Sequence, residues 1–278
     1  MKHTKTINVL LALQTAGTVL TACSSDEETS VQVKTYYMTI NATKHVSESM
    51  ARATRALTLT ESTLTASWAT TEKVYVEGQL ANGDPFTFDG TLSPQSEGTN
   101  TVLNGTISLP NGWITTIVDI ITDAPILNLH FPCKEKPDYS TGQKGTLEDI
   151  AKNYDYAIAT AVQYHIQNNQ IIGSTYADFV NQQAIVKFTL KDKAESSTLL
   201  NPTELTVAYG DQSIKLNNIP YATYTTNGNG VLFVAIPGFS GQTVTLTATV
   251  GNDTYTFTKD NVTFENSNYY EINVKMNK

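Results

Sequence analysis

Side chains that bind metals or attack substrates are few in this chain and lie far apart. Beyond the first 22 residues they are Cys23, His45, His130, Cys133 and His165. His130 and Cys133 form an H-x-x-C pair, but no second pair completes the four ligands of a structural zinc site. A nucleophilic pair of Cys133 with a histidine stays open, although no motif supports it. We predict no metal, no cofactor and no catalytic residue, with Cys133 packed as a small buried hydrophobic side chain.

Two other sequence patterns resemble functional motifs only superficially. Glu148 and Asp149 are neighbours on a predicted helix, where successive side chains point about 100° apart and cannot converge on one bond. The run Asn-Gly-Asn-Gly from Asn227 to Gly230 lacks the strand-to-helix context of a phosphate loop, and we predict a hairpin turn there. The sequence therefore gives no reason to expect an enzyme.

The composition favours an exported β-protein without a nucleic-acid partner. The 278 residues carry a formal net charge of −8, and an acidic surface repels phosphate backbones. Only 16% of the residues are charged, so Thr, Ser, Asn and Gln must supply much of the polar surface. The length is sufficient for two domains that each bury a core.

The first 22 residues have the pattern of an export signal. A basic start precedes an apolar stretch from Ile7 to Leu20 that is too short and too polar to span a membrane. Leu20-Thr21-Ala22-Cys23 resembles the bacterial lipobox, which predicts cleavage after Ala22 and acylation of Cys23. Acyl chains on Cys23 would then hold the protein to outer-membrane lipid. The alternative is an ordinary signal peptide with a chance cysteine.

An acidic segment follows the lipobox. Ser24 to Glu28 reads Ser-Ser-Asp-Glu-Glu, which is typical of a solvated tether. It also resembles the signal that sends lipoproteins of Bacteroides-type bacteria to the cell surface, and we predict surface exposure. With Cys23 acylated, Cys133 can form no disulfide within the mature chain.

The chain has two arginines, and they lie three positions apart. Arg52 and Arg55 belong to a polar linker from Asn41 to Arg55, where a protease can reach the backbone. A solvated turn with two basic residues accounts for them equally well. Val31 to Ile40 predicts a strand of the first domain. Cutting the linker would free this strand, and its loss would expose an apolar slot and unpaired backbone groups that a strand of another chain can fill.

Strand patterns dominate the rest of the chain. The candidates before residue 182 are 57–65, 73–76, 86–88 and 112–121, and those after it are 184–190, 204–209, 212–216, 231–236, 244–250, 254–258 and 269–276. Thr146 caps a short helix through Ala151, and nothing else is convincingly helical. Seven strands in about 95 residues are typical of a small sandwich. We predict an all-β protein with two tandem β-sandwich domains.

Tyrosine pairs open a second functional class. Tyr36/Tyr37, Tyr154/Tyr156 and Tyr269/Tyr270 could stack on sugars, although tyrosine is also a favoured strand residue. The alternative to a structural subunit is therefore a glycan-binding surface lipoprotein of a polysaccharide-uptake system. Such a protein would keep its chain intact and expose aromatic side chains in one row.

In its ordered set of motifs the chain resembles fimbrillin-type lipoproteins, the pilin superfamily of Bacteroides-like bacteria. The motifs that carry this resemblance are Leu20 to Cys23, Ala51 to Leu57, Tyr139 to Ala151 with Tyr154-Asp155, Ala184 to Leu190 and Tyr270 to Val274. Each motif is degenerate, so the resemblance rests on their order along nearly the whole chain.

The resemblance implies two transthyretin-like Greek-key β-sandwiches, with residues 1–22 as lipoprotein signal, 23–55 as tether and propeptide, and domains at 56–181 and 182–278. It also implies cleavage by an arginine-specific protease at Arg52 or Arg55, removal of the strand 31–40, and assembly with other pilin subunits by strand exchange. A host or bacterial glycan or protein would be the adhesion receptor, and the location would be a fimbrium on the outer membrane. Stalk members carry further donor strands beyond the one that ends here at Met276, so a tip or accessory role, or an uncleaved anchor, is the expectation.

Overall fold

The computed structural model describes residues 33–44, 56–60, 63–79, 85–86, 89–110 and 126–278. The predicted sites at Ala22, Cys23, Arg52 and Arg55 and the strand predicted at 112–121 lie outside these residues. The described part is mostly β, as predicted, with two short helices. No helix within it is long and apolar enough to cross a membrane. The division into transthyretin-like domains at 181/182 stays a prediction.

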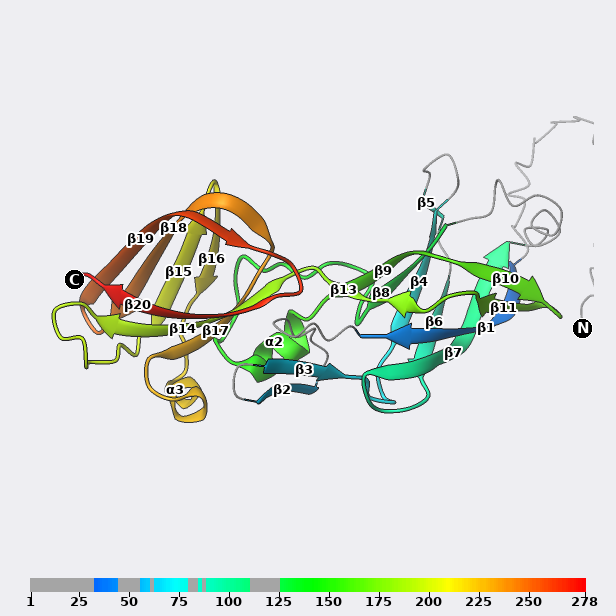
Figure 1. Cartoon of the computed structure of the whole chain (residues 1–278), viewed down its shortest axis with the longest axis horizontal. Coiled ribbons are helices and arrows are strands. Elements are labelled where there is room, and N and C mark those ends of the chain that lie inside the picture. Colours follow the sequence, from blue (N-terminus) through cyan, green and yellow to red (C-terminus); the bar gives the residue numbers. More distant parts are fainter. Residues whose placement is uncertain (1–32, 45–55, 61–62, 80–84, 87–88, 111–125) are drawn as a thin grey trace, which may run out of the picture. The chain divides into compact units, whose positions relative to one another are not determined.

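An eleven-stranded sheet is formed by strands that lie between Val33 and Asn181 (Figure 1). Its strands are β1 (Val33–Thr43), β4 (Val74–Gln79), β5 (Pro85–Phe86), β6 (Asp89–Pro94), β7 (Asn100–Pro110), β8 (Ile126–Phe131), β9 (Ala157–Val162), β10 (Tyr164–Gln167), β11 (Gln170–Gly173), β12 (Ala177–Asp178) and β13 (Val180–Asn181). The order is β10-β11-β1-β7-β6-β4-β8-β9-β13, with β12 also paired to β1 and β5 to β4. The inward side chains of eight of these strands form one cluster around Trp68, Phe131 and Phe179.

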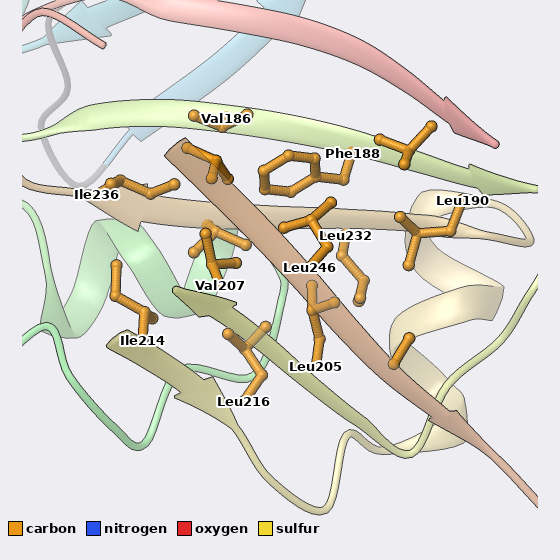
Figure 2. Packing of buried hydrophobic residues seen from close by; sticks show 14 of the residues in the cluster. Val186, Phe188, Leu190, Leu205, Val207, Ile214, Leu216, Leu232, Ile236 and Leu246 are labelled. Carbon is orange, nitrogen blue, oxygen red and sulfur yellow. The ribbon is translucent and has the colours of Figure 1, made fainter. Parts of the chain in front are cut away.

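Residues 184–276 form seven strands, the number predicted, in two smaller sheets. One sheet has the order β17-β14-β20 and the other β16-β15-β18-β19. The strands are β14 (Ala184–Asp192), β15 (Glu204–Tyr209), β16 (Gln212–Leu216), β17 (Val231–Ile236), β18 (Phe239–Val250), β19 (Asp253–Phe264) and β20 (Tyr269–Met276). Figure 2 shows Val186 and Phe188 of the first sheet pointing toward Val207 and Leu246 of the second. Side chains along each strand point alternately to the two faces of its sheet, so every second residue of β14 and β15 enters the core between the sheets.

Local signals determined the helix α2 (Leu147–Asn153). Thr146 accepts a hydrogen bond from the Asp149 backbone N–H at 3.1 Å, so the predicted N-cap is confirmed. Beside it the single strand predicted at 57–65 is instead a hairpin of β2 (Ala56–Thr60) and β3 (Thr63–Ser67). Leu59 of β2 packs against the cluster that contains Ile150 of α2.

Two predictions for residues 220–230 were wrong. A second helix, α3 (Tyr221–Asn227), is present where no helix was predicted. Its sequence Tyr-Ala-Thr-Tyr-Thr-Thr-Asn has no side-chain cap and, apart from Ala222, no strong helix former, so propensity gave little signal. The glycine run that follows is the helix end rather than a hairpin turn, with Gly228 as C-cap at φ 96°.

The segment from Tyr139 to Thr146 covers the free edge of β17. The Gln143 side chain accepts from the Ala235 N–H at 2.8 Å and donates to the Ala235 carbonyl oxygen at 2.8 Å, as a neighbouring strand would. Its amide also donates to the Tyr139 carbonyl oxygen at 3.1 Å. Gln143 is 1% exposed, so these backbone groups have no access to water. One buried amide thus satisfies the backbone of Ala235 at a sheet edge.

Replacing this amide tests its role. Gln143→Met keeps the volume but leaves the Ala235 N–H and carbonyl without partners, and buried unsatisfied groups cost about 1–3 kcal/mol each. We expect the free energy of unfolding to fall by about 2–4 kcal/mol in urea titrations. Lys144→Ala, at the exposed neighbouring position, should change it by less than about 0.5 kcal/mol. Equal effects of the two variants would contradict the assignment.

Candidate functional site

The strand predicted to be removable is β1, and it lies inside the large sheet. Every one of its eleven residues pairs antiparallel with β7, from Val33 opposite Pro110 to Thr43 opposite Asn100. Its other side pairs parallel with β11 at residues 37–39 and with β12 at residues 42–43. β1 is therefore an interior strand of the sheet, although it comes first among the described elements.

Alternation along β1 sends one row of side chains into the core. Tyr36, Met38, Ile40 and Ala42 are at most 3% exposed, whereas Tyr37 and Asn41 of the alternate row are exposed. Burying side chains of the size of Met38 and Ile40 stabilises a fold by roughly 1.5–3 kcal/mol each. Ile40 packs against Gly173 of β11 so closely that a Cβ there would overlap its side chain. The inward row thus fits a specific slot between β7 and β11.

The boundaries predicted for this segment need a correction. The strand was predicted to end at Ile40 and a polar linker to begin at Asn41, but β1 continues to Thr43. Asn41 is exposed and Ala42 is buried, so the alternation of exposed and buried side chains continues through this segment although it contains polar residues. The next residue in the alternation is Lys44, which is also buried at 3% exposure.

Lys44 extends the inward row of β1 with a charge. Its Nζ lies 3.6 Å from Oε2 of Glu72, a residue that is itself 3% exposed. The same nitrogen lies 3.3 Å from the centroid of the Trp68 ring and 4.7 Å from that of Phe131. A cation over the face of an indole is attracted by the negative face of the ring. Lys44 is therefore bound between a carboxylate and two aromatic rings.

A second buried carboxylate is electrostatically coupled to the same cation. Asp155 is 1% exposed, and its Oδ1 accepts from Nε2 of Gln183 at 3.2 Å. Burial raises the pKa of Asp155 well above its ordinary value, while attraction to Lys44 works in the opposite direction. Burial also lowers the pKa of Lys44 to about 7, against the attraction of Glu72 and Asp155. The charge of Lys44 thus attracts two carboxylates, Glu72 and Asp155, in a site shielded from water.

Rigid aromatic packing holds this charged cluster in place. Trp68 meets Phe131 and Phe179 edge to face, at ring-centroid distances of 5.4 and 5.3 Å. The backbone N–H of Trp68 donates to the Gly98 carbonyl at 2.7 Å, and that of Ala69 donates to Glu72 Oε2 at 3.0 Å. The carboxylate of Glu72 is therefore fixed by the main chain that follows Trp68, independently of Lys44.

The structure gives the sequence-predicted chemical residues other roles. His130 Nδ1 lies 2.8 Å from the Tyr156 hydroxyl, and Nε2 lies 2.7 Å from Glu77 Oε2. Cys133 was predicted to be buried, but it is partly exposed and donates to the Glu135 carbonyl at 3.1 Å. Burial raises the pKa of the Cys133 thiol, which disfavours the nucleophilic thiolate. No group of three or more potential metal ligands occurs among the described residues.

The predicted tyrosine pairs do not form an exposed row in the described residues. Tyr36, Tyr154, Tyr156 and Tyr269 are buried. Asp149 is buried too, where it accepts from the Lys144 backbone N–H, so it is a structural residue of α2. Neither Lys44 nor its partners were candidates from the sequence. The signal that could have found Lys44 is its place two residues after Ala42 in an alternating row.

Comparison with known proteins gives matches among solved structures. No protein-family model and no curated protein matches the chain. The solved structures include a fimbrial protein from Bacteroides ovatus, with 10% identity, a TM-score of 0.40, and coverage of 87% of this chain and 49% of that one. This chain thus spans about half the length of that protein.

In two further matches, the alignment covers nearly the whole of the matched protein. The tip fimbrial protein Mfa3 from Porphyromonas gingivalis, with C-terminal truncation, has 8% identity and a TM-score of 0.42, with coverage of 87% and 95%. A fimbrial assembly protein from Parabacteroides distasonis has 13% identity and a TM-score of 0.37, with coverage of 87% and 92%. These three matches are to fimbrial proteins of Bacteroidales. Function has to be argued from the residues of this chain itself.

Removing the buried cation should be costly, and more so at high pH. Lys44→Met leaves Glu72 and Asp155 buried without a counter-charge, and breaking a buried pair costs about 3–5 kcal/mol. The raised pKa of Asp155 means that the folded state holds a proton that the unfolded state releases, so stability falls as pH rises above the ordinary carboxyl range. Without Lys44 this fall extends to higher pH.

We therefore expect Lys44→Met to lose more unfolding free energy at pH 8 than at pH 5, measured by urea titration at both values. Adding Asp155→Asn to Lys44→Met should recover part of the loss at pH 8, because the asparagine oxygen still accepts from Gln183. A loss that is the same at both pH values and unaffected by Asp155→Asn would mean that only packing was disturbed.

Proposed function

We propose that the protein is a fimbrial subunit or accessory component on the bacterial surface, in which β1 is a replaceable strand. It is exported as a lipoprotein through Cys23 and matured by arginine-specific cleavage at Arg52 or Arg55. A strand of another subunit then takes the place of β1, and the resulting polymer serves adhesion. The proposal includes the two transthyretin-like domains implied by the sequence resemblance.

The position of β1 in the chain and in the sheet is the observation that carries this proposal. β1 pairs on both sides with strands that come much later in the sequence, β7 on one side and β11 and β12 on the other. Its connection to all of them runs through residues 45–55, the segment that contains both arginines. A cut there leaves β1 held by non-covalent contacts alone.

The other side of the cleavage point is consistent with a clean cut. β2 begins at Ala56, directly after Arg55, and pairs with β3 along its full length. Cleavage after Arg55 therefore removes no residue of β2. The slot that β1 would leave combines an apolar floor with two rows of backbone donors and acceptors, which an extended strand can satisfy.

The glycan-binding alternative has less support in the described residues. Among the residues that the structure describes, the exposed large aromatic side chains are Tyr37, Tyr176 and Tyr221, at 43%, 63% and 73%. They belong to β1, to the segment before β12 and to α3, and so do not follow one strand. The predicted tyrosine pairs contribute mainly buried residues. An uncleaved anchor differs from a fimbrial subunit only in retaining residues 23–55.

The N-terminus of the native protein decides between these roles. We expect chains from sheared surface filaments to begin at Ala53 or Ala56, and chains from the outer membrane to begin at acylated Cys23. Arg52→Ala/Arg55→Ala should keep the protein in the membrane with its lipid and remove it from filaments. Mass spectrometry of both fractions measures this. Lys34→Ala, an exposed position of β1, is the matched control and should leave the distribution unchanged.

An acylated chain found only in the membrane of the wild type, with no filament form, would contradict the fimbrial proposal. The same result would favour the anchor or the glycan-binding lipoprotein. An Arg52→Ala/Arg55→Ala protein that still enters filaments would contradict the cleavage sites.

A further inference from the structure

The members of the charged cluster at Lys44 lie on opposite sides of the proposed cleavage sites in the sequence. Lys44 precedes the linker 45–55, so it leaves together with β1 when that linker is cut. Glu72 and Asp155 follow the linker and remain in the body of the protein. Cleavage therefore separates a buried cation from both of its carboxylates.

The two carboxyl groups that remain, those of Glu72 and Asp155, have no other cation among the described residues that is known to pair with them. Glu72 Oε2 accepts from the Ala69 N–H and Asp155 Oδ1 accepts from Gln183. Glu72 Oε1, Asp155 Oδ2 and Lys44 Nζ have no hydrogen-bond partner among the described residues even with Lys44 in place, so the ammonium group acts on the carboxylates through its charge. Both side chains are at least 97% buried, given exposures of 3% and 1%. Without the cation, a Glu72 carboxylate has no counter-ion, and Asp155 avoids a second unpaired charge only by holding its proton. Burying an unpaired charge is strongly unfavourable.

We propose that the strand that replaces β1 in assembly carries a lysine at the position of Lys44, and that Glu72, Asp155 and Trp68 select partners by this cation. The inference rests on the proposed strand exchange and specifies its partner. The incoming strand presents apolar side chains at the four positions of Tyr36, Met38, Ile40 and Ala42, and then the ammonium group two residues later.

The shape of the site favours an ammonium group in particular. Nζ of Lys44 lies 3.3 Å from the Trp68 ring centroid, a distance that a compact cation reaches without displacing the ring. A neutral side chain of the same length would fill the space but leave Glu72 and Asp155 unpaired. An acidic side chain would add a third negative charge. The apolar positions thus give affinity, and the last position discriminates between partners.

Peptide exchange into the cleaved protein tests the inference. The full-length protein in detergent is cut with an arginine-specific protease and incubated with a fluorescent amidated peptide of residues 33–45 or with its Lys44→Met form. We expect both peptides to displace the cleaved β1 segment at pH 6, below the pKa of about 7 that burial gives Lys44, with the Lys44→Met peptide at least 100-fold weaker in competition anisotropy. The factor corresponds to the cost of leaving one buried charge unpaired.

A carboxylate-free protein provides the matched control. In Glu72→Gln/Asp155→Asn, where both amides keep the acceptor oxygens, the difference between the two peptides should shrink to less than about fivefold. Asp155→Asn alone, which retains Glu72 beside Lys44, should give an intermediate difference and serves if the double variant does not fold.

The possible failures are distinguishable. If neither peptide enters the cleaved protein, strand exchange itself is wrong, and the proposed function falls with the inference. If both peptides enter with equal affinity, strand exchange stands and selection by the cation is overturned. An undiminished difference between the peptides in Glu72→Gln/Asp155→Asn, or in Asp155→Asn where that single variant is used, would also overturn it, because the carboxylates would not be its cause.

Discussion

Backbone pairing between β1 and its neighbours is the interaction on which the large sheet depends. β1 joins β7 to β11 and β12, and in the described sheet no other strand connects β10, β11 and β12 to β7. Without β1 the inner face would lose its apolar row, and the flanking strands would expose unpaired N–H and carbonyl groups. Such an open sheet is not a stable end state in water, so any process that removes β1 must supply another strand.

Burial of Lys44 is difficult to explain as a device for stability alone. Taking an ammonium group and two carboxylates out of water costs more than packing hydrophobic side chains of the same volume in many proteins. The cluster nevertheless occupies the last inward position of the strand that the linker makes separable. A charge at that position adds a requirement that apolar packing cannot impose, namely the chemical identity of the occupant. Discrimination between strands is a benefit that offsets its cost in stability.

The sequence predicted those parts of the fold that local signals determine. Thr146 predicted α2 because its side chain caps the helix within the same turn. The alternating runs of residues 184–276 predicted all seven strands there. The helix α3 was missed because only Ala222 among its residues strongly favours a helix and no side chain caps it. The charged cluster was missed for a different reason. Lys44, Glu72 and Asp155 are far apart in sequence and meet only through sheet pairing, and a lysine after a polar stretch is ordinarily a surface residue.

The buried cation also resolves an ambiguity that a β-strand cannot resolve by itself. Side chains alternate with a period of two, so a slip of one residue would turn the inward row of β1 outward and is strongly disfavoured. A slip of two residues keeps the same faces and would still bury apolar side chains. It would also move the ammonium group of Lys44 by about 7 Å along the strand, given a rise of about 3.4 Å per residue, and away from Glu72. Alternation therefore excludes odd slips and the buried charge excludes even ones, so that the two together define a single register for the strand in this slot.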